Sequence, residues 1–321
     1  MNPKPEFVIK RVFSSGGKHP RGRLNLSSKW IGKRVIVALE DSYIALSKRD
    51  YDRMRKLLSN STVLLKLFER LLNSSNGSKM FSIVSKTWNP ITGCLHECRY
   101  CWARRLAETK LKNSYRYKKG FVPRLNEREF NARFSEGDFV FVSDMGDLFG
   151  GFIPRNWILK VLSHIKKFPK TYFLFLTKNP ARYAEFINEL PENVILGATI
   201  ETDRDEMYLE HKISRAPLPS VRYEALRRIQ WDKKFVAIEP ILDFNLDRFS
   251  KWIEDIMPIM VYLGYYNYNN RLPEPPLSKT LRLIERLSRI TLLVRKTLRQ
   301  SWNEGLNQHL VEEMSDESGR T

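Results

Sequence analysis

Short apolar segments alternate with helix-like segments along most of the chain after residue 80. Seven runs have the length and composition of buried strands, and stretches with apolar residues at helical spacing lie between most of them. Strand and helix in turn predict an α/β fold with a parallel sheet and right-handed crossovers, either open or rolled into a barrel. The expected strands cover residues 81–84, 139–143, 172–177, 194–200, 235–239, 259–264 and 290–294. The expected helices include residues 157–167, 181–190, 221–229 and 277–287.

The beginning of the chain has a different pattern. Residues 7–9 and 35–39 predict strands, and residues 51–72 repeat apolar side chains at helical spacing. Six small polar residues at positions 73–78 then indicate a linker. We expect a basic β-rich module with a helix over residues 1–72, a linker over 73–79, an α/β domain over 80–303 and a polar tail over 304–321.

The chain is strongly basic. It carries 55 Lys and Arg against 36 Asp and Glu, a net charge of +19, and residues 1–78 hold +10 of it. A basic excess favours a polyanionic partner, because phosphate contacts release counterions. We therefore expect the N-terminal module to bind DNA or RNA, with a solvated basic surface as the competing explanation. Its basic residues concentrate at Arg21, Arg23, Lys29, Lys33 and Arg34.

The expected location follows from what the sequence lacks. No apolar run approaches the roughly 18 residues of a membrane span. Residues 1–10 are charged and have no apolar stretch like that of a signal peptide. We therefore expect a cytoplasmic protein without a membrane partner.

All three cysteines lie in one segment, Cys94-Leu-His-Glu-Cys98-Arg-Tyr-Cys101, with the spacing C-x3-C-x2-C. An odd, tight group predicts a metal or redox site rather than disulfides. Three thiolates can hold three irons of a [4Fe–4S] cluster, and the lack of a fourth cysteine leaves one iron open. The alternatives are buried thiols or a Cys3His zinc site, in which His96 would strain the short loop.

This motif, with Tyr100 before the last cysteine, resembles the signature of the radical S-adenosylmethionine superfamily. The resemblance implies a partial (β/α) barrel over residues 80–303 and a [4Fe–4S] cluster on Cys94, Cys98 and Cys101. It also implies S-adenosylmethionine as a cofactor, whose methionine part binds the fourth iron. Reductive cleavage would give a 5′-deoxyadenosyl radical, so an external electron donor is expected as a partner.

Five further blocks narrow the resemblance to a branch of the superfamily found in phages and archaea. The blocks are also similar, more loosely, to spore photoproduct lyase, a DNA-repair member. After the sixth strand this chain has Gly264-Tyr-Tyr-Asn-Tyr, where the branch has Gly-Gly-Glu-Ser, a departure that concerns the substrate rather than the cofactor. The blocks are Thr87-Trp-Asn-Pro-Ile-Thr-Gly-Cys94, Phe139-Val-Phe-Val-Ser-Asp-Met-Gly-Asp-Leu-Phe149, Phe175-Leu-Thr-Lys-Asn-Pro180, Leu196-Gly-Ala-Thr-Ile-Glu201 and Ile238-Glu-Pro-Ile241.

Polar residues after the strands are the candidates for holding the cofactor, because ligands bind at the carboxyl ends of parallel strands. Lys178 is a cation for the cofactor carboxylate, a role that similarity to the lyase supports. Thr199 and Glu201 point the same way and can hold the methionyl group and a ribose diol. The resemblance adds the residues after the second strand, for the ammonium group, and an arginine. The complete expected set is Ser143, Asp144, Lys178, Thr199, Glu201, Arg222 and Glu239.

Each of these residues has a structural alternative. Lys178 can cap a turn before Pro180, and Glu201 can be the first acidic residue of a helix. Arg222 can lie on a helix face, and Asp144 can pair with the basic insertion at residues 113–136.

Three functions remain open. The first is a radical enzyme that repairs or modifies nucleic acid, and the second is the same chemistry on a protein or small molecule. The third is a non-catalytic nucleic-acid-binding protein with a structural iron–sulfur or zinc site. If the three cysteines hold a cluster, no thiol is left as a hydrogen-atom donor, so Tyr265, Tyr266 and Tyr268 are candidates for that role or for packing.

Overall fold

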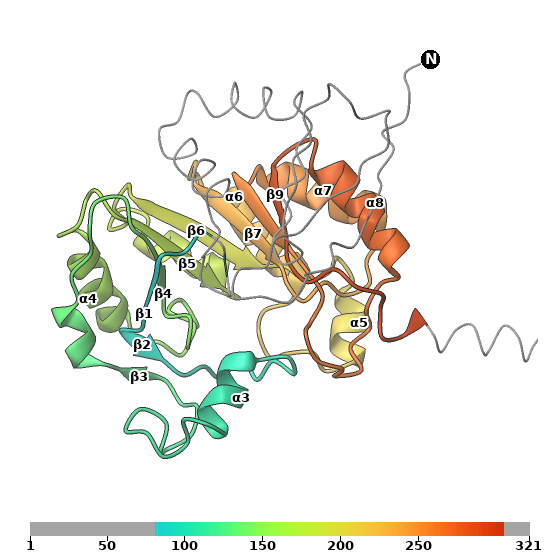
Figure 1. The fold of residues 1–321 in the computed structure, drawn as a ribbon. Helices are drawn as coiled ribbons and strands as arrows, with labels where there is room; N and C mark the ends of the chain where they lie inside the picture. Colours follow the sequence, from blue (N-terminus) through green and yellow to red (C-terminus); the bar gives the residue numbers. More distant parts are fainter. Residues whose placement is uncertain (1–80, 82, 305–321) are drawn as a thin grey trace, which may run out of the picture.

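The described part of the chain is built around one curled sheet of seven parallel strands (Figure 1). The computed structural model describes residue 81 and residues 83–304. The strands follow one another across the sheet in chain order, which confirms the predicted parallel sheet, rolled into a partial (β/α) barrel. They are β1 (Lys86–Trp88), β4 (Phe139–Val142), β5 (Tyr172–Thr177), β6 (Val194–Thr199), β7 (Lys234–Ile238), β8 (Met260–Leu263) and β9 (Leu292–Arg295).

Side chains of each strand alternate between the two faces of the sheet, as the period of two requires. On β4, Phe139 and Phe141 belong to the cluster inside the half-barrel, whereas Val140 and Val142 belong to the cluster that also contains the helices. The same alternation runs through the later strands. We call the edge of the half-barrel at the carboxyl ends of the strands its mouth. A polar residue that follows a strand and keeps the alternation of the inward-facing side chains is therefore placed at this mouth.

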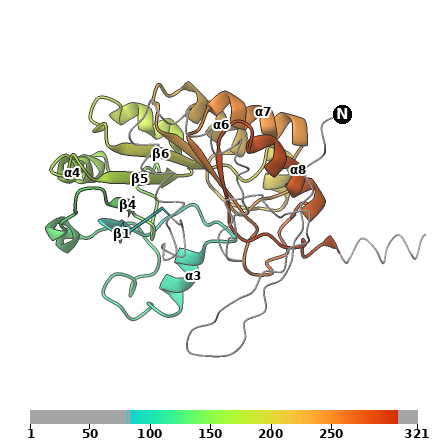
Figure 2. The same cartoon turned by 45° about the horizontal axis from the view of Figure 1, so that its top comes forward.

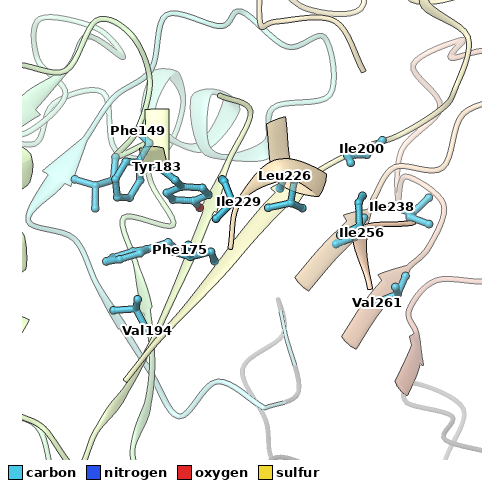
Figure 3. Packing of buried hydrophobic residues seen from close by; sticks show 14 of the residues in the cluster. Phe149, Phe175, Tyr183, Val194, Ile200, Leu226, Ile229, Ile238, Ile256 and Val261 are labelled. Carbon is cyan, nitrogen blue, oxygen red and sulfur yellow. The ribbon is translucent and has the colours of Figure 1, made fainter. Parts of the chain in front are cut away.

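The helices cover the outer face. Figure 3 shows Leu226 of α6 and Ile229, just after it, in one cluster with Phe175 of β5 and Ile238 of β7. Full burial of each such side chain contributes about 1.5–3 kcal/mol. The α-helices are α3 (Trp102–Glu108), α4 (Arg155–Ile165), α5 (Asp205–Glu210), α6 (Pro219–Arg228), α7 (Leu246–Ile256) and α8 (Leu277–Leu287), and the 3-10 helices are η2 (Glu127–Asn131) and η3 (Pro180–Phe186).

The first strand, predicted over residues 81–84, is misplaced, since residues 81, 83 and 84 are not in a strand and the described sheet begins with β1. Two of the three residues of this edge strand, Lys86 and Thr87, are exposed, so β1 lacks the apolar pattern that a buried strand shows in sequence. The predicted helix over 181–190 is also wrong in type. Its hydrogen bonding begins with Arg182 N–H to the Asn179 carbonyl, an i+3 bond of the 3-10 type.

Phe81, predicted to lie in a strand, fills the inside of the half-barrel. Its ring centroid lies 5.3 Å from that of Phe141, 5.8 Å from that of Phe235 and 4.5 Å from that of Tyr262. These three rings come from β4, β7 and β8. The interior is therefore packed with aromatic side chains beneath the strand ends.

Residues 113–136, a basic insertion without clear periodicity in the sequence, contribute two short elements. One is η2, and the other is β3 (Arg124–Leu125), which pairs antiparallel with β2 (Ile91–Thr92). The predicted module at 1–72, the linker at 73–79 and the tail after residue 304 lie outside the described residues. Within the described residues, no helix has both the length and the apolar composition to cross a bilayer.

Candidate active site

The cysteine segment starts from a fixed point beside the carboxyl end of β4. Gly93 has a φ of +85°, and a Cβ added there would stand 2.0 Å from the carbonyl oxygen of Val122, so only glycine fits. The Gly93 N–H donates to the carbonyl of Met145 at 2.9 Å. Cys94 follows directly, and the segment runs on to Cys101, which caps the N-terminus of α3.

Each cysteine sulfur has a hydrogen-bonding group beside it. The backbone N–H two residues after Cys94 points at its Sγ at 3.5 Å. Ser214 Oγ lies 3.1 Å from Cys98 Sγ, and the N–H three residues after Cys101 donates to that sulfur at 3.3 Å. The backbone N–H donors at Cys94 and Cys101 are of a kind that stabilises thiolates and tunes metal-bound sulfur.

Burial raises the pKa of all three thiols. The pKa of Cys94 is raised further by Asp147 and by the other two cysteines. A thiol in these surroundings keeps its proton unless a cation compensates for the negative charge, and a bound metal supplies that charge. Within the described part of the chain, no group of three or more His, Cys, Asp or Glu side chains is arranged to hold a metal ion.

His96, the fourth ligand of the zinc alternative, contacts a carboxylate instead. Its Nε2 lies 3.0 Å from Asp147 Oδ2, and both side chains are buried. Burial acts to raise the pKa of Asp147, but the hydrogen bond and charge of His96 hold it below its usual value. Asp147 also accepts the backbone N–H of Lys178 at 2.9 Å. The His96–Asp147 pair therefore links the cysteine segment to the end of β5.

Glu201, two residues after β6, is the centre of what we call the glutamate cluster: Glu201, Lys178, Arg222 and Tyr100. Lys178 Nζ and the Tyr100 hydroxyl both donate to Glu201 Oε1, and Arg222 donates to Oε2 at 2.7 Å. Glu201 and Arg222 are fully buried, and the Lys178 side chain is 12% exposed. Two strand ends, α6 and the cysteine segment thus meet at one carboxylate.

The glutamate cluster carries two positive charges and one negative charge. Burial acts to raise the pKa of Glu201, but Arg222 and Lys178 together hold it at about 2. The charge of Lys178 also reaches Cys98, where it acts to lower the pKa of that thiol. The arrangement therefore favours a further anionic group beside the cysteine segment.

The residues after β4 form a second group of predicted cofactor ligands. Ser143 has a φ of +59°, a left-handed conformation, and its buried hydroxyl has no hydrogen-bond partner among the described residues. Strained backbone with a free buried polar atom is typical of binding positions. Asp144 accepts a hydrogen bond from Asn89 at 2.5 Å, and burial raises the pKa of Asp144.

Of the two remaining predicted ligands, one lies beside the glutamate cluster and the other lies away from it. Thr199 is buried at the end of β6, and its carbonyl accepts a hydrogen bond from Arg222. Glu239, after β7, contacts Lys296 with both carboxylate oxygens, at 2.6 and 2.7 Å. Glu239 is therefore paired towards β9 rather than towards the glutamate cluster.

Lys178, Glu201 and Arg222, all predicted as cofactor ligands, are neighbours in the structure, and their role as ligands stays a prediction. Several of the partners in the site were not predicted. Asn89 and Asp147 lie inside sequence blocks that we had singled out, which was the available signal for them. Ser214 and Lys296 lie outside every block and are recognised only from the fold.

Comparisons with known proteins place this geometry in context. No curated protein matches the chain. Among solved structures, spore photoproduct lyase with bound AdoMet and dinucleoside spore photoproduct matches with 13% identity and a TM-score of 0.41, over 64% of this chain and 62% of that one. Streptococcus suis SuiB bound to S-adenosylmethionine matches with 10% identity and a TM-score of 0.41, over 79% and 67%. Both are radical S-adenosylmethionine enzymes. A family model, "Protein of unknown function (DUF5131)", matches residues 79–253, and the chain therefore belongs to this family.

Proposed function

We propose that this chain is a radical S-adenosylmethionine enzyme. Cys94, Cys98 and Cys101 would hold three irons of a [4Fe–4S] cluster, and the cofactor would bind at the fourth. When bound, the two groups supply the reductive cleavage of S-adenosylmethionine to methionine and a 5′-deoxyadenosyl radical.

The observation that carries this proposal is the surroundings of the three thiols. All three are half-buried, each has a hydrogen-bonding group at its sulfur, and all three belong to one short loop. A [4Fe–4S] cluster uses such a set, because each thiolate binds a different iron.

The neighbouring side chains fit the cofactor. The glutamate cluster has one more positive charge than negative charge, and Lys178 is its partly exposed cation, which supports its role as the partner of the cofactor carboxylate. The free hydroxyl of Ser143 supports a role in holding the ammonium group. Burial around both excludes water and strengthens these contacts. The roles of Thr199, Asp144 and Glu239 stay predictions.

We also propose that the substrate is nucleic acid. The support is the net charge of +19 across the whole chain, of which +10 lies in residues 1–78. Such an excess strengthens binding to phosphates by counterion release. A reductant from outside the chain would deliver the electron to the cluster.

Anaerobic reconstitution with iron and sulfide tests the first proposal. We expect about four irons per chain, a reduced cluster whose EPR spectrum changes when S-adenosylmethionine is added, and formation of 5′-deoxyadenosine. Replacing any one of the three cysteines by Ala should abolish both cluster assembly and cofactor cleavage. Stoichiometric zinc with no uptake of iron would overturn the proposal.

A matched control is Ser163→Ala, an exposed position on α4, which should leave iron content and cleavage unchanged. The substrate proposal is tested by the same assay with and without DNA or RNA. Analysis of the nucleic acid by mass spectrometry should show an altered nucleotide that appears only when S-adenosylmethionine and reductant are both present.

A further inference from the structure

A strongly basic surface follows the last cysteine. Residues 99–124 contain nine Lys and Arg and one Glu, a balance of +8 in 26 residues. Figures 1 and 2 show α3 and the loop after it at the rim of the molecule, away from α7. This surface belongs to the described part of the chain and is distinct from the basic N-terminal module.

Many of these cations are not neutralised within the protein. Arg105, Lys110, Lys112, Lys118 and Lys119 are exposed, and none of them forms an ion pair with a carboxylate among the described residues. Basic residues that serve solubility are usually balanced by neighbouring acids, whereas a run of unpaired cations creates a positive potential that attracts a polyanion. The first property of the surface is therefore its unbalanced charge.

Exposed aromatic rings lie among the cations. Tyr115 is 70% exposed, and its ring centroid lies 3.9 Å from the Arg124 guanidinium carbon and 5.7 Å from Lys118 Nζ. Tyr268 is 48% exposed, and its ring centroid lies 4.3 Å from the guanidinium carbon of Arg105. An acidic protein needs cations alone, whereas a nucleic acid offers both phosphates for the cations and bases for the rings. The cation–aromatic pairs therefore favour a nucleic acid.

The surface leads to the proposed active site through a row of tyrosines. Tyr268 packs against Tyr266 with ring centroids 5.5 Å apart, and Tyr266 packs against Tyr100 at 6.3 Å. The Tyr100 hydroxyl donates to Glu201 in the glutamate cluster. Arg99 ties the cysteine segment to the loop of Tyr268 by donating to the Asn270 carbonyl at 3.0 Å. Contacts thus continue from the exposed rings to the strand ends.

We propose that residues 99–124 and Tyr268 form a basic platform that binds single-stranded nucleic acid and leads it to the mouth of the half-barrel. This inference rests on the proposed function, since it names the surface through which a nucleic acid substrate would reach the radical site. The bases stack on Tyr115 and Tyr268, and the phosphates contact the unpaired lysines. Single strands are favoured because paired bases do not present their faces to side chains.

The test uses the full chain and a fluorescently labelled oligo(dT) of about 20 nucleotides, a length that covers one or two binding sites. Fluorescence anisotropy is measured over a range of salt concentrations. The platform variant carries Lys110→Gln, Lys118→Gln and Lys119→Gln. A matched control carries Lys166→Gln, Lys167→Gln and Lys170→Gln, three exposed lysines between α4 and β5 at the opposite end of the sheet. Thermal unfolding confirms that both variants fold.

Charge and stacking leave different signatures. The platform variant should lose affinity at least tenfold, and its log–log salt slope should be smaller by about 2, since each lost phosphate contact contributes about 0.7 for single strands. Tyr115→Ala should lower affinity about 5- to 150-fold, the equivalent of about 1–3 kcal/mol of stacking, with the slope unchanged. Tyr115→Phe should restore the affinity.

Equal loss in the platform and control variants would overturn the proposal, because binding would then depend on total charge alone. A second result would also overturn it. If the platform variant kept its oligonucleotide affinity but its cluster were reduced more slowly by an acidic electron-transfer protein, the surface would be a docking site for the reductant. The variants should still form 5′-deoxyadenosine with dithionite as reductant. Oligonucleotide binding through the platform in a chain that cleaves no S-adenosylmethionine would refute the proposed enzyme and leave the platform standing.

Discussion

At the scale of single residues, the chemistry of the candidate site depends on one buried carboxylate. Glu201 is fully buried. The positive charges of Arg222 and Lys178 keep it ionised, because they hold its pKa at about 2 against an ordinary 4.5. Removing one partner from a buried ion pair costs about 3–5 kcal/mol, because the other charge stays buried without compensation. Glu201 is therefore expected to affect stability and, in the proposed site, cofactor affinity as well.

We expect the stability of the protein to fall between about pH 4.5 and pH 2 as Glu201 takes up a proton. A carboxyl whose pKa is lowered by folding contributes stability above its unfolded pKa, and that contribution is lost as the pH falls through the folded value. Glu201→Gln should be less stable by about 3–5 kcal/mol at pH 7 and should show a shallower loss in acid. Urea unfolding at a series of pH values measures both.

The control for this experiment is Glu285→Gln. Glu285 pairs with Arg289 on an exposed face of α8, where removing a surface ion pair costs at most about 1 kcal/mol. This variant should keep the acid dependence of the parent protein. An identical acid profile in Glu201→Gln would contradict the assignment.

Ser143 allows a second test, in which stability and cofactor binding should move in opposite directions. Ser143→Gly relieves the left-handed backbone, so the free energy of unfolding should rise by up to about 1 kcal/mol. Loss of the hydroxyl should weaken S-adenosylmethionine binding about threefold to tenfold. Ser143→Ala should show the weaker binding without the gain in stability. Unchanged affinity in both variants would remove Ser143 from the site.

At the scale of helices and strands, the sequence was informative where an element is buried on both faces. β4 to β9 are such strands, and their apolar runs predicted them. β1 was missed because an edge strand with exposed Lys86 and Thr87 has no such pattern. Alternation of side chains along the strands also explains why Lys178, Glu201 and Glu239 could be placed at the mouth from the sequence. The pairing of Glu239 with Lys296 could not be predicted, because it depends on the curvature of the sheet.

Gly197 shows how tightly β6 is packed. A Cβ added there would stand 2.0 Å from the Phe235 ring and 2.7 Å from the Phe175 carbonyl. Gly197→Ala should therefore destabilise the protein by about 1–3 kcal/mol in thermal or denaturant unfolding. Gly151→Ala is the control, because its nearest neighbour would lie 3.9 Å away, and its stability should change by less than about 1 kcal/mol. Equal stability of the two variants would show that β6 has room to adjust.

At the scale of the whole molecule, the net charge can be counted from the sequence, but its position on the surface cannot. The excess of +19 predicted a polyanionic partner and pointed to residues 1–78, which lie outside the described residues. The sequence indicated a basic insertion at residues 113–136, but not the surface that it forms with α3, because the exposure of these cations depends on how the chain folds around α3.

A chain that lacks residues 1–78 tests whether the N-terminal module binds nucleic acid while the α/β domain carries the cofactor site. We expect it to bind iron and cleave S-adenosylmethionine as the full chain does, because every residue of the candidate site lies after Lys86. Its affinity for nucleic acid should be lower and its salt slope smaller by about 0.7 for each lost contact to a single strand. Anisotropy titrations of both chains measure the difference. Equal slopes would assign the module another role.

The aromatic ring of Phe81 has a consequence for the order of events. Because Phe81 fills the half-barrel beneath the strand ends, packed against rings from β4, β7 and β8, we expect small molecules to reach the candidate site from the mouth. A polymer lying across that mouth would shut a cofactor in or out. We therefore expect a compulsory sequence of binding, with S-adenosylmethionine first and nucleic acid second. In a pulse-chase experiment, saturating oligonucleotide should trap bound radiolabelled cofactor, and unhindered exchange would show a second way out.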